Sequence, residues 1–343
     1  MPVAIAETTR GGITESVHYG VVVAVDATGE VIASAGDLET VVFFRSSAKP
    51  FQAIPVIESG AADAFGFTPA ELALCCASHE GSPEHQQQVE VMLDKIGLSS
   101  TDLQCGCSFP GHEVEAAQVI LGGVEGSPLH CDCSGKHAGM LATIVHEGLS
   151  HHDYLDPEHP LQQRILGIMA EVMRVPVETI VPGTDGCSLP TFGAPVRAFA
   201  TAYAALAAPE QVPAGMGREH AVALDRLRAA MVAHPENVAG HGQLVTDLMA
   251  LSDGRIVAKS GAEGLICLAV PDRGFGIAIR VMDGSFRTHA AVTVATLEQL
   301  GILDAATRDA ILERHSPQLC NHNGRLVGEI RPDFQLEGAV AVA

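Results

Sequence analysis

The sequence predicts an α+β fold, in which both ends of the chain form one mostly antiparallel sheet and a large helical lobe lies between them. Residues 20–37 and 264–281 each resemble a β-hairpin, because apolar runs flank a short polar turn. From about residue 46 to residue 254 apolar residues recur mainly at helical spacing. No low-complexity linker divides the chain, so we expect one domain over 1–343, with a sheet lobe at 1–45 and 255–343 and a helical lobe at 46–254.

The elements follow in a simple order along the chain. The first hairpin turns at "DATGE", and residues 41–60 then lead from an apolar run into a helix that ends near Gly60 and bends at Pro55. Apolar spacing predicts further helices over 85–97, 112–123, 136–148, 160–174, 190–206, 219–234 and 243–251. The second hairpin turns at "PDR", helices are predicted over 290–301 and 305–315, and a strand over 324–332 closes the chain.

Composition excludes several classes of partner. The formal net charge is −21, so nucleic acid and anionic membrane surfaces are poor partners, because binding them requires clusters of Lys and Arg. The N-terminus lacks the basic and apolar regions of a signal peptide, and no window is apolar enough for a membrane span. We therefore expect a cytoplasmic protein whose nine cysteines are mostly reduced.

The stretch "RSSAKPFQA" places Ser46 three residues before Lys49 at the start of the first predicted helix. A serine becomes a nucleophile when a base lies within hydrogen-bond reach, and a lysine can be that base if it is neutral. The alternative is structural, with Ser46 or Ser47 capping the helix and Lys49 in solvent. The motif by itself leaves both interpretations open.

A second group of chemically active residues combines thiols and amines. "HCDCSGKHAGM" supplies Cys133, Lys136 and His137, and "PGTDGCSLP" supplies Asp185 and Cys187. Thiolates and imidazoles suit zinc, yet no C-x-x-C pair occurs, so buried reduced cysteines are the alternative. Asp185 would otherwise be the acceptor of an Asx-turn.

The order of these motifs is itself informative. S-x-x-K near the start, a middle serine motif and K-[TS]-G near the end occur in this order in the penicillin-recognising serine enzymes. Here "KSGAEG" supplies Lys259 and Gly261, and the middle serine is either Ser134 of "CSGKH" or Ser78 of "CCASHEGSPEHQ". No Asn follows two places after either serine, which argues against a β-lactam enzyme. The structural interpretation of Ser78's stretch is a helix N-terminus, capped by Ser82.

Taken together, six stretches resemble the class 3, rhizobial-type L-asparaginases: "RSSAKPFQA", "CCASHEGSPEHQ", "CGCSFPGHE", "HCDCSGKHAGML", "GTDGCSLPTFGAP" and "KSGAEG". The resemblance runs from about residue 15 to the last strand. It implies a single catalytic domain with a fold like that of serine β-lactamases, penicillin-binding proteins and related glutaminases. It also implies a zinc-containing, homodimeric amidohydrolase that converts L-asparagine to L-aspartate and ammonia (EC 3.5.1.1).

The same resemblance implies roles for individual residues. Ser46 matches the nucleophile and Lys49 its partner, while Ser78 and Lys259 match a second Ser–Lys pair. The matching zinc ligands are Cys133, Lys136 and Cys187, and the matching substrate contacts are Arg45, His137, Asp185 and Gly261. Two ammonium groups in one site would disfavour each other's charge, so we expect at least one lysine with a lowered pKa.

Other functions stay open at this point. A glutaminase differs in its substrate by one methylene, which a pocket discriminates by only ~1–3 kcal/mol. A β-lactamase or peptidase-like serine hydrolase of the same fold is a further alternative, and so is a zinc-binding protein that is not an enzyme.

Overall fold

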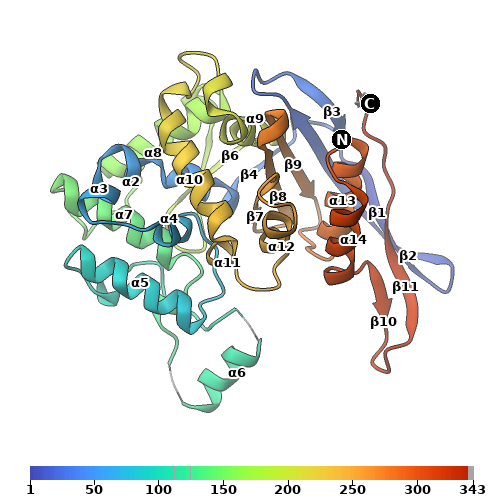
Figure 1. Ribbon diagram of the computed structural model, residues 1–343, viewed down its shortest axis with the longest axis horizontal. Coiled ribbons are helices and arrows are strands. Elements are labelled where there is room, and N and C mark those ends of the chain that lie inside the picture. The colour runs from blue at the N-terminus through green and yellow to red at the C-terminus, as the bar shows by residue number, and fades with distance from the viewer. Residues whose placement is uncertain (112, 124, 339–343) are drawn as a thin grey trace. The chain divides into compact units, whose positions relative to one another are not determined.

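The computed structural model describes residues 1–111, 113–123 and 125–338 (Figure 1). The chain divides into two compact units, each assembled from separate segments. The first unit comprises Met1–Ser47, Ala194–Val212 and Asp247–Ala343, and the second comprises Ala48–Gly193 and Pro213–Thr246. Residues 194–212 thus belong with the sheet, whereas the sequence places them in the helical lobe.

The first unit is built on a sheet in which both ends of the chain pair. Its strand order is β10-β11-β1-β2-β9-β8-β7, and β3 also pairs with β2. All the described pairings in this sheet are antiparallel. The strands are β1 (Val3–Arg10), β2 (Ile13–Val25), β3 (Val31–Ala35), β7 (Val257–Gly261), β8 (Leu265–Val270), β9 (Phe275–Val281), β10 (Gln318–Cys320) and β11 (Leu326–Pro332). The α+β class and the mostly antiparallel sheet are confirmed.

Helices cover this sheet. Helix α9 (Val196–Ala207) packs on β2, β8 and β9, and α13 (His289–Gln299) packs on β1 and β11. Gly276 of β9 is required at the first contact, because a Cβ there would lie 1.9 Å from the Ala200 carbonyl oxygen. The remaining elements of this unit are β4 (Val41–Phe43), α14 (Ala305–Arg314) and two short 3-10 turns, η5 (Pro209–Gln211) and η7 (Pro271–Arg273).

The second unit is mainly helical. Its longer helices are α4 (Pro69–Cys75), α5 (Pro83–Lys95), α6 (Glu113–Leu121), α7 (Ser134–Glu147), α8 (Pro160–Met173) and α10 (Ala221–Ala233). Its shorter elements are α1 (Lys49–Gln52), α2 (Ile54–Glu58), α3 (Ala61–Ala64), α11 (Pro235–Val238), η2 (Ser100–Asp102), η3 (Pro128–His130), η4 (Val177–Thr179), η6 (Arg218–His220) and the hairpin of β5 (Val181–Thr184) with β6 (Pro190–Pro195). Helix α12 (Leu244–Leu251) and η1 (Arg45–Ala48) carry the chain across the division between the units.

The structure alters two predicted elements and adds a strand that was not predicted. The helix expected over 190–206 begins only at Val196, since Pro190 and Pro195 cannot continue a helical hydrogen-bond pattern and Pro190–Pro195 pairs with β5 instead. The helix expected to end near Gly60 is divided at Ala53 into α1 and α2, just before Pro55. Strand β1 was not predicted; it pairs with β2 across the turn at Gly11 and Gly12 and with the distant strand β11. The expected helix over 112–123 includes residue 112, which lies outside the described residues.

Within the described part of the chain, no helix combines the length and apolarity that crossing a membrane requires.

Candidate active site

The segment that carries Ser46 forms a 3-10 turn rather than a capped helix start. Arg45 has a φ of 49°, in the left-handed region, and Ser46 follows it half-buried in η1. Ala48 occupies the N-cap of α1 with no side-chain capping bond, and the Ser47 hydroxyl donates instead to the Lys259 carbonyl oxygen at 3.1 Å. The capping interpretation of Ser46 or Ser47 is therefore wrong. A non-glycine residue in the left-handed region stores backbone strain of a kind that is common at functional sites.

Helix α9 holds this turn in place from within the same unit. The Phe44 ring stacks on Phe199 with ring centroids 4.1 Å apart, and the Tyr203 hydroxyl donates to the Ser47 carbonyl oxygen at 2.9 Å. All three aromatic rings are completely buried. The backbone around Ser46 is consequently fixed by packing and by a hydrogen bond.

Strand β7 brings the C-terminal motif to the same turn. Lys259 is fully buried, and its Nζ donates to the Ser260 carbonyl oxygen at 2.9 Å. A Cβ at Gly261 would lie 3.0 Å from both the Phe44 carbonyl oxygen and the Ser47 hydroxyl oxygen. Gly261 therefore allows β7 to approach the Ser46 turn closely.

Lys49 lies in the helical unit and is fully buried, so its interpretation as a solvated side chain is wrong. Its Nζ donates to the Ala77 carbonyl oxygen at 2.6 Å and to the Ser78 hydroxyl at 2.8 Å. The Asp132 carboxylate lies 3.6 Å away. A charged amine without solvent requires such partners, because burying an unpaired charge is costly.

The charge of Lys49 is stabilised by its surroundings. Burial would lower its pKa, but the negative charges of Cys133 and Asp132 outweigh burial, and the pKa is raised. The lowered pKa expected from two neighbouring ammonium groups is therefore not found at Lys49. The raised pKa favours the ammonium form of Lys49, which donates to Ser78.

Two glycines of α7 allow this helix to pack closely against α4. A Cβ at Gly135 would lie 2.5 Å from the Leu74 carbonyl oxygen, so a side chain there would push α7 away from α4. A Cβ at Gly139 would similarly lie 2.6 Å from the Cys75 sulfur. This close approach places the residues after α4 beside those before α7, and the His79 amide donates to the Asp132 carbonyl oxygen.

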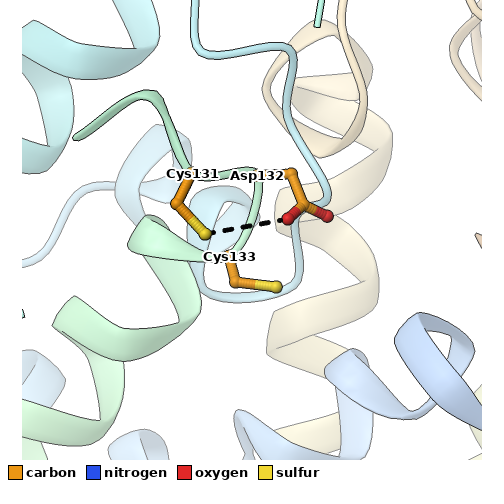
Figure 2. A group of neighbouring side chains, drawn as sticks. All are labelled: Cys131, Asp132 and Cys133. Carbon is orange, nitrogen blue, oxygen red and sulfur yellow. Dashed lines mark hydrogen bonds between the residues drawn. The ribbon is translucent and has the colours of Figure 1, made fainter. Parts of the chain in front are cut away.

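The thiols and amine singled out from the sequence come together in the same unit. Lys136 Nζ donates to Cys187 Sγ at 3.1 Å, and the Cys133 thiol is hydrogen-bonded to both Cys131 and Cys187. Contact with the other two thiols lowers the pKa of Cys133 well below its usual range, and the Lys49 and Lys136 charges add to this effect. Figure 2 shows Cys131, Asp132 and Cys133 at the start of α7, where Cys131 Sγ lies 3.9 Å from an Asp132 oxygen.

Cys133, Lys136 and Cys187 fit zinc as a donor set. All three are buried, and the 3.1 Å between Lys136 Nζ and Cys187 Sγ is close to the roughly 3.5 Å that separates an amine and a thiolate on tetrahedral zinc. The proton on Lys136 is stabilised, since the Cys133 and Cys187 charges outweigh burial and raise its pKa. A metal ion would have to displace that proton.

His137 presents a buried ring nitrogen toward this region. The Gln104 amide donates to the Tyr154 hydroxyl at 2.9 Å, so that hydroxyl can donate its own hydrogen to His137 Nδ1 at 2.7 Å. Burial, reinforced by the Lys136 charge, lowers the pKa of His137 well below its usual range. The ring is then neutral with its hydrogen on Nε2, which finds no hydrogen-bond partner among the described residues. A buried donor of this kind is satisfied by a ligand or a water molecule.

Asp185 lies in a tight turn between β5 and β6. Its Oδ1 accepts from the Gly186 amide at 2.9 Å, and its backbone amide donates to the Leu189 carbonyl oxygen at 2.8 Å. The turn carries Cys187 into the thiol cluster, and the Asp185 charge contributes to the raised pKa of Lys136. Ser82 caps α5, as its stretch predicts, by accepting from the His85 amide.

One known protein family matches nearly the whole chain. The family described as L-asparaginase II matches residues 6–332. The chain belongs to the L-asparaginase II family. Membership indicates an amidohydrolase. No curated protein matches the chain significantly.

Solved structures resemble the chain only distantly. Mglu in its native form is 16% identical, with a TM-score of 0.38, over 83% of this chain and 66% of its own. The chain thus spans just under two thirds of that structure's length. A β-lactamase from Mycobacterium bovis is 14% identical, with a TM-score of 0.40, over 87% of this chain and 95% of its own.

Proposed function

We propose that this amidohydrolase converts L-asparagine to L-aspartate and ammonia through a serine nucleophile and a lysine base. The observation that carries the proposal is the fully buried Lys49, whose Nζ donates to the Ser78 hydroxyl at 2.8 Å. A lysine shielded from solvent and bonded to a serine hydroxyl can transfer protons within a dry site. In a chain of the L-asparaginase II family, that supports cleavage of an amide.

The proposed reaction has two halves. Ser46 attacks the side-chain amide carbon, its proton passes to neutral Lys49, and the C–N bond breaks as Ser78 relays that proton to the departing ammonia. Water then attacks the resulting ester, gives a proton to Lys49 through Ser78, and releases aspartate as Ser46 regains its hydrogen. Lys259 is proposed to support Ser78.

The proposed substrate contacts follow from charge and hydrogen bonding. Asp185 is suited to the α-ammonium group of the amino acid, and Arg45 to its carboxylate. The unpartnered Nε2–H of His137 can donate to a substrate oxygen. Gly261 is suited to close approach, because its Cα carries no side chain.

Zinc is proposed at Cys133, Lys136 and Cys187. When bound there it would supply a Lewis acid next to the site and a position for water or substrate. We expect about one zinc per chain, and Cys133→Ala should weaken its binding at least ten-fold. Elemental analysis measures the zinc content per chain, and competition with a chelator measures the zinc affinity. The exposed thiol variant Cys320→Ala is the matched control. A Cys133→Ala protein with unchanged zinc content would reject this donor set.

Release of ammonia from L-asparagine and L-glutamine, together with the colour change of a chromogenic β-lactam on ring opening, tests the proposed function directly. We expect turnover to favour asparagine. Equal or faster turnover of glutamine would make the protein a glutaminase, and turnover of the β-lactam would support a β-lactamase-like hydrolase. No turnover of any of them by zinc-loaded protein would favour a non-enzymatic zinc protein.

We also propose a cytoplasmic homodimer, on the strength of the resemblance in the sequence. Light scattering of the purified chain at low concentration tests the dimer. A monomer that retains full activity would reject it as a requirement for catalysis.

A further inference from the structure

A second group of metal-ligating side chains lies in the helical unit, built from other residues than the thiol cluster. His220 of η6 is almost completely buried, with 6% of its surface exposed. Its Nδ1 lies 2.6 Å from a Glu58 oxygen and its Nε2 lies 2.8 Å from a Glu171 oxygen. Glu58 ends α2 and Glu171 lies in α8, so one imidazole joins three segments that are distant in sequence.

The two carboxylate contacts of His220 depend on the protonation of its ring. A neutral imidazole has one N–H donor and one lone pair, so it can donate to only one of the two carboxylates. A second proton lets the ring donate to both carboxylates: burial would lower the pKa of His220, but the hydrogen bonds to Glu58 and Glu171 outweigh burial and raise it. A metal ion on Nε2 would take the place of that proton. A ring nitrogen whose partner nitrogen donates to a carboxylate is the usual arrangement of a metal-bound histidine.

A third carboxylate, that of Glu219, lies close to this group. One ligand atom each from Glu171, Glu219 and His220 lie within 4.8 Å of one another. Glu171 and Glu219 are exposed and can shift by the small distance needed to close around an ion. The three atoms would then form an N/O donor set, which suits divalent transition ions such as zinc and cobalt.

A cavity beside His220 provides space for an ion, and it is an observation separate from the hydrogen bonds. A cavity of about 410 Å³ is lined by Glu58, Glu219 and His220 together with Ile57, Val222 and Ala223. Its polar lining residues are the carboxylates and the imidazole themselves. Such a cavity can admit an ion and the water that completes its coordination.

We propose that Glu171, Glu219 and His220 form a second binding site for a divalent transition-metal ion, with Glu58 holding the His220 ring in position. The donor set is nitrogen and carboxylate oxygen, so the site differs chemically from the thiol cluster. An ion there would link α8 to η6, and through Glu58 to α2. Its proposed role is to stabilise the helical unit, and it takes no part in the proposed reaction.

Titration of metal-free protein with Co²⁺ tests this site separately from the thiol site. Cobalt bound by thiolates gives an intense sulfur-to-metal absorption band, whereas cobalt bound by nitrogen and carboxylate does not. We expect one equivalent of cobalt beyond any that produces the thiolate band, and we expect that equivalent to raise the melting temperature. Equilibrium dialysis counts the ions while absorption reports their ligands.

Variants assign the extra equivalent to these side chains. His220→Gln should abolish it, Glu219→Gln should weaken it at least ten-fold, and Glu58→Gln should weaken it about 10- to 100-fold. The exposed Glu178→Gln is the matched control and should bind normally. Glu219 is exposed, so its variant tests the proposal even if the His220 variant does not fold. Absence of the extra equivalent, or its retention in Glu219→Gln, would overturn the proposal whatever happens at the thiol band.

Discussion

At the scale of single residues, burial distinguishes between the two interpretations of Lys49, a solvated side chain and a partner of a serine. Its place three residues after Ser46 is compatible with a solvated side chain, but the residue is fully buried, with Nζ bonded to Ala77 and Ser78. Removing a lysine from water is costly, and at Lys49 hydrogen bonds and the nearby negative charges of Cys133 and Asp132 offset that cost. A fully buried lysine amine is therefore a candidate functional group.

Ser46 and Ser78 are the two candidates for the proposed nucleophile, and variants of each should show which serine forms the acyl-enzyme. Ser46→Ala should reduce turnover at least about 1,000-fold and abolish the acyl-enzyme, because no nucleophile remains. Ser78→Ala should slow turnover yet leave an adduct on Ser46. Mass spectrometry of protein quenched during turnover locates the adduct. Ser47→Ala is the neighbouring control and should retain the adduct, whereas an adduct found only on Ser78 would reverse the assignment.

Activity should increase with pH. The raised pKa of Lys49 keeps its amine protonated near neutrality, so the neutral form required of a base becomes more abundant as pH rises. The expected profile of kcat/KM rises between pH 6 and pH 10 and is still rising at pH 10, because the pKa of Lys49 is raised above the ordinary lysine value of about 10.4. Circular dichroism over the same range controls for unfolding. A flat profile in folded protein would contradict a lysine base.

At the scale of elements, the contact between α4 and α7 shapes the region around Ser78. Gly135 of α7 faces the Leu74 carbonyl oxygen with no room for a Cβ, whereas Gly167 of α8 has open space around it. A methyl group at Gly135 forces the helices apart, while at Gly167 it only improves helix propensity.

Gly135→Ala should therefore destabilise the protein by about 1–3 kcal/mol, and Gly167→Ala should stabilise it by roughly 0.5–1 kcal/mol. Chemical denaturation measures both. Because Gly135 directly follows Ser134 and lies near Cys133, its variant should also lose zinc affinity. Equal effects of the two substitutions would show that the close approach of α4 and α7 is unimportant.

At the scale of the whole molecule, folding joins segments that are far apart in sequence. The sheet unit combines both ends of the chain, and α13 covers β1 and β11. His289 begins α13 and is buried, and burial lowers its pKa to about 4. Its protonation is therefore coupled to the stability of this unit.

Acidification should weaken the fold through His289. The folded pKa is below the unfolded value of about 6.5, so the unfolded chain binds the proton more tightly and stability falls as pH drops from about 6.5 toward 4. The expected loss is about 1 kcal/mol between pH 7.5 and pH 5.5. Chemical denaturation of wild type and His289→Gln at both pH values measures how much of the pH dependence of the unfolding free energy is due to His289. An identical pH dependence in the two proteins would exclude it.

The sequence by itself determined the fold class and the order of the elements. Alternating and helical apolar spacing are local properties, and they predicted both hairpins and most of the helices, including α7 and α8. Long ordered motifs also pointed to the L-asparaginase family. The motifs named Lys49, Ser78, Cys133, Lys136 and Cys187 before any contact between them was visible.

Only the tertiary structure decided which of these side chains meet. Lys49 contacts Ser78 across 28 intervening residues, and Lys136 contacts Cys187 across 50, because glycines let α7 approach α4 and a tight turn returns Cys187. The group around His220 had no motif at all, since its members come from α2, α8 and η6. Spacing along the chain records local geometry, whereas burial, protonation and ligand sets depend on packing between distant segments.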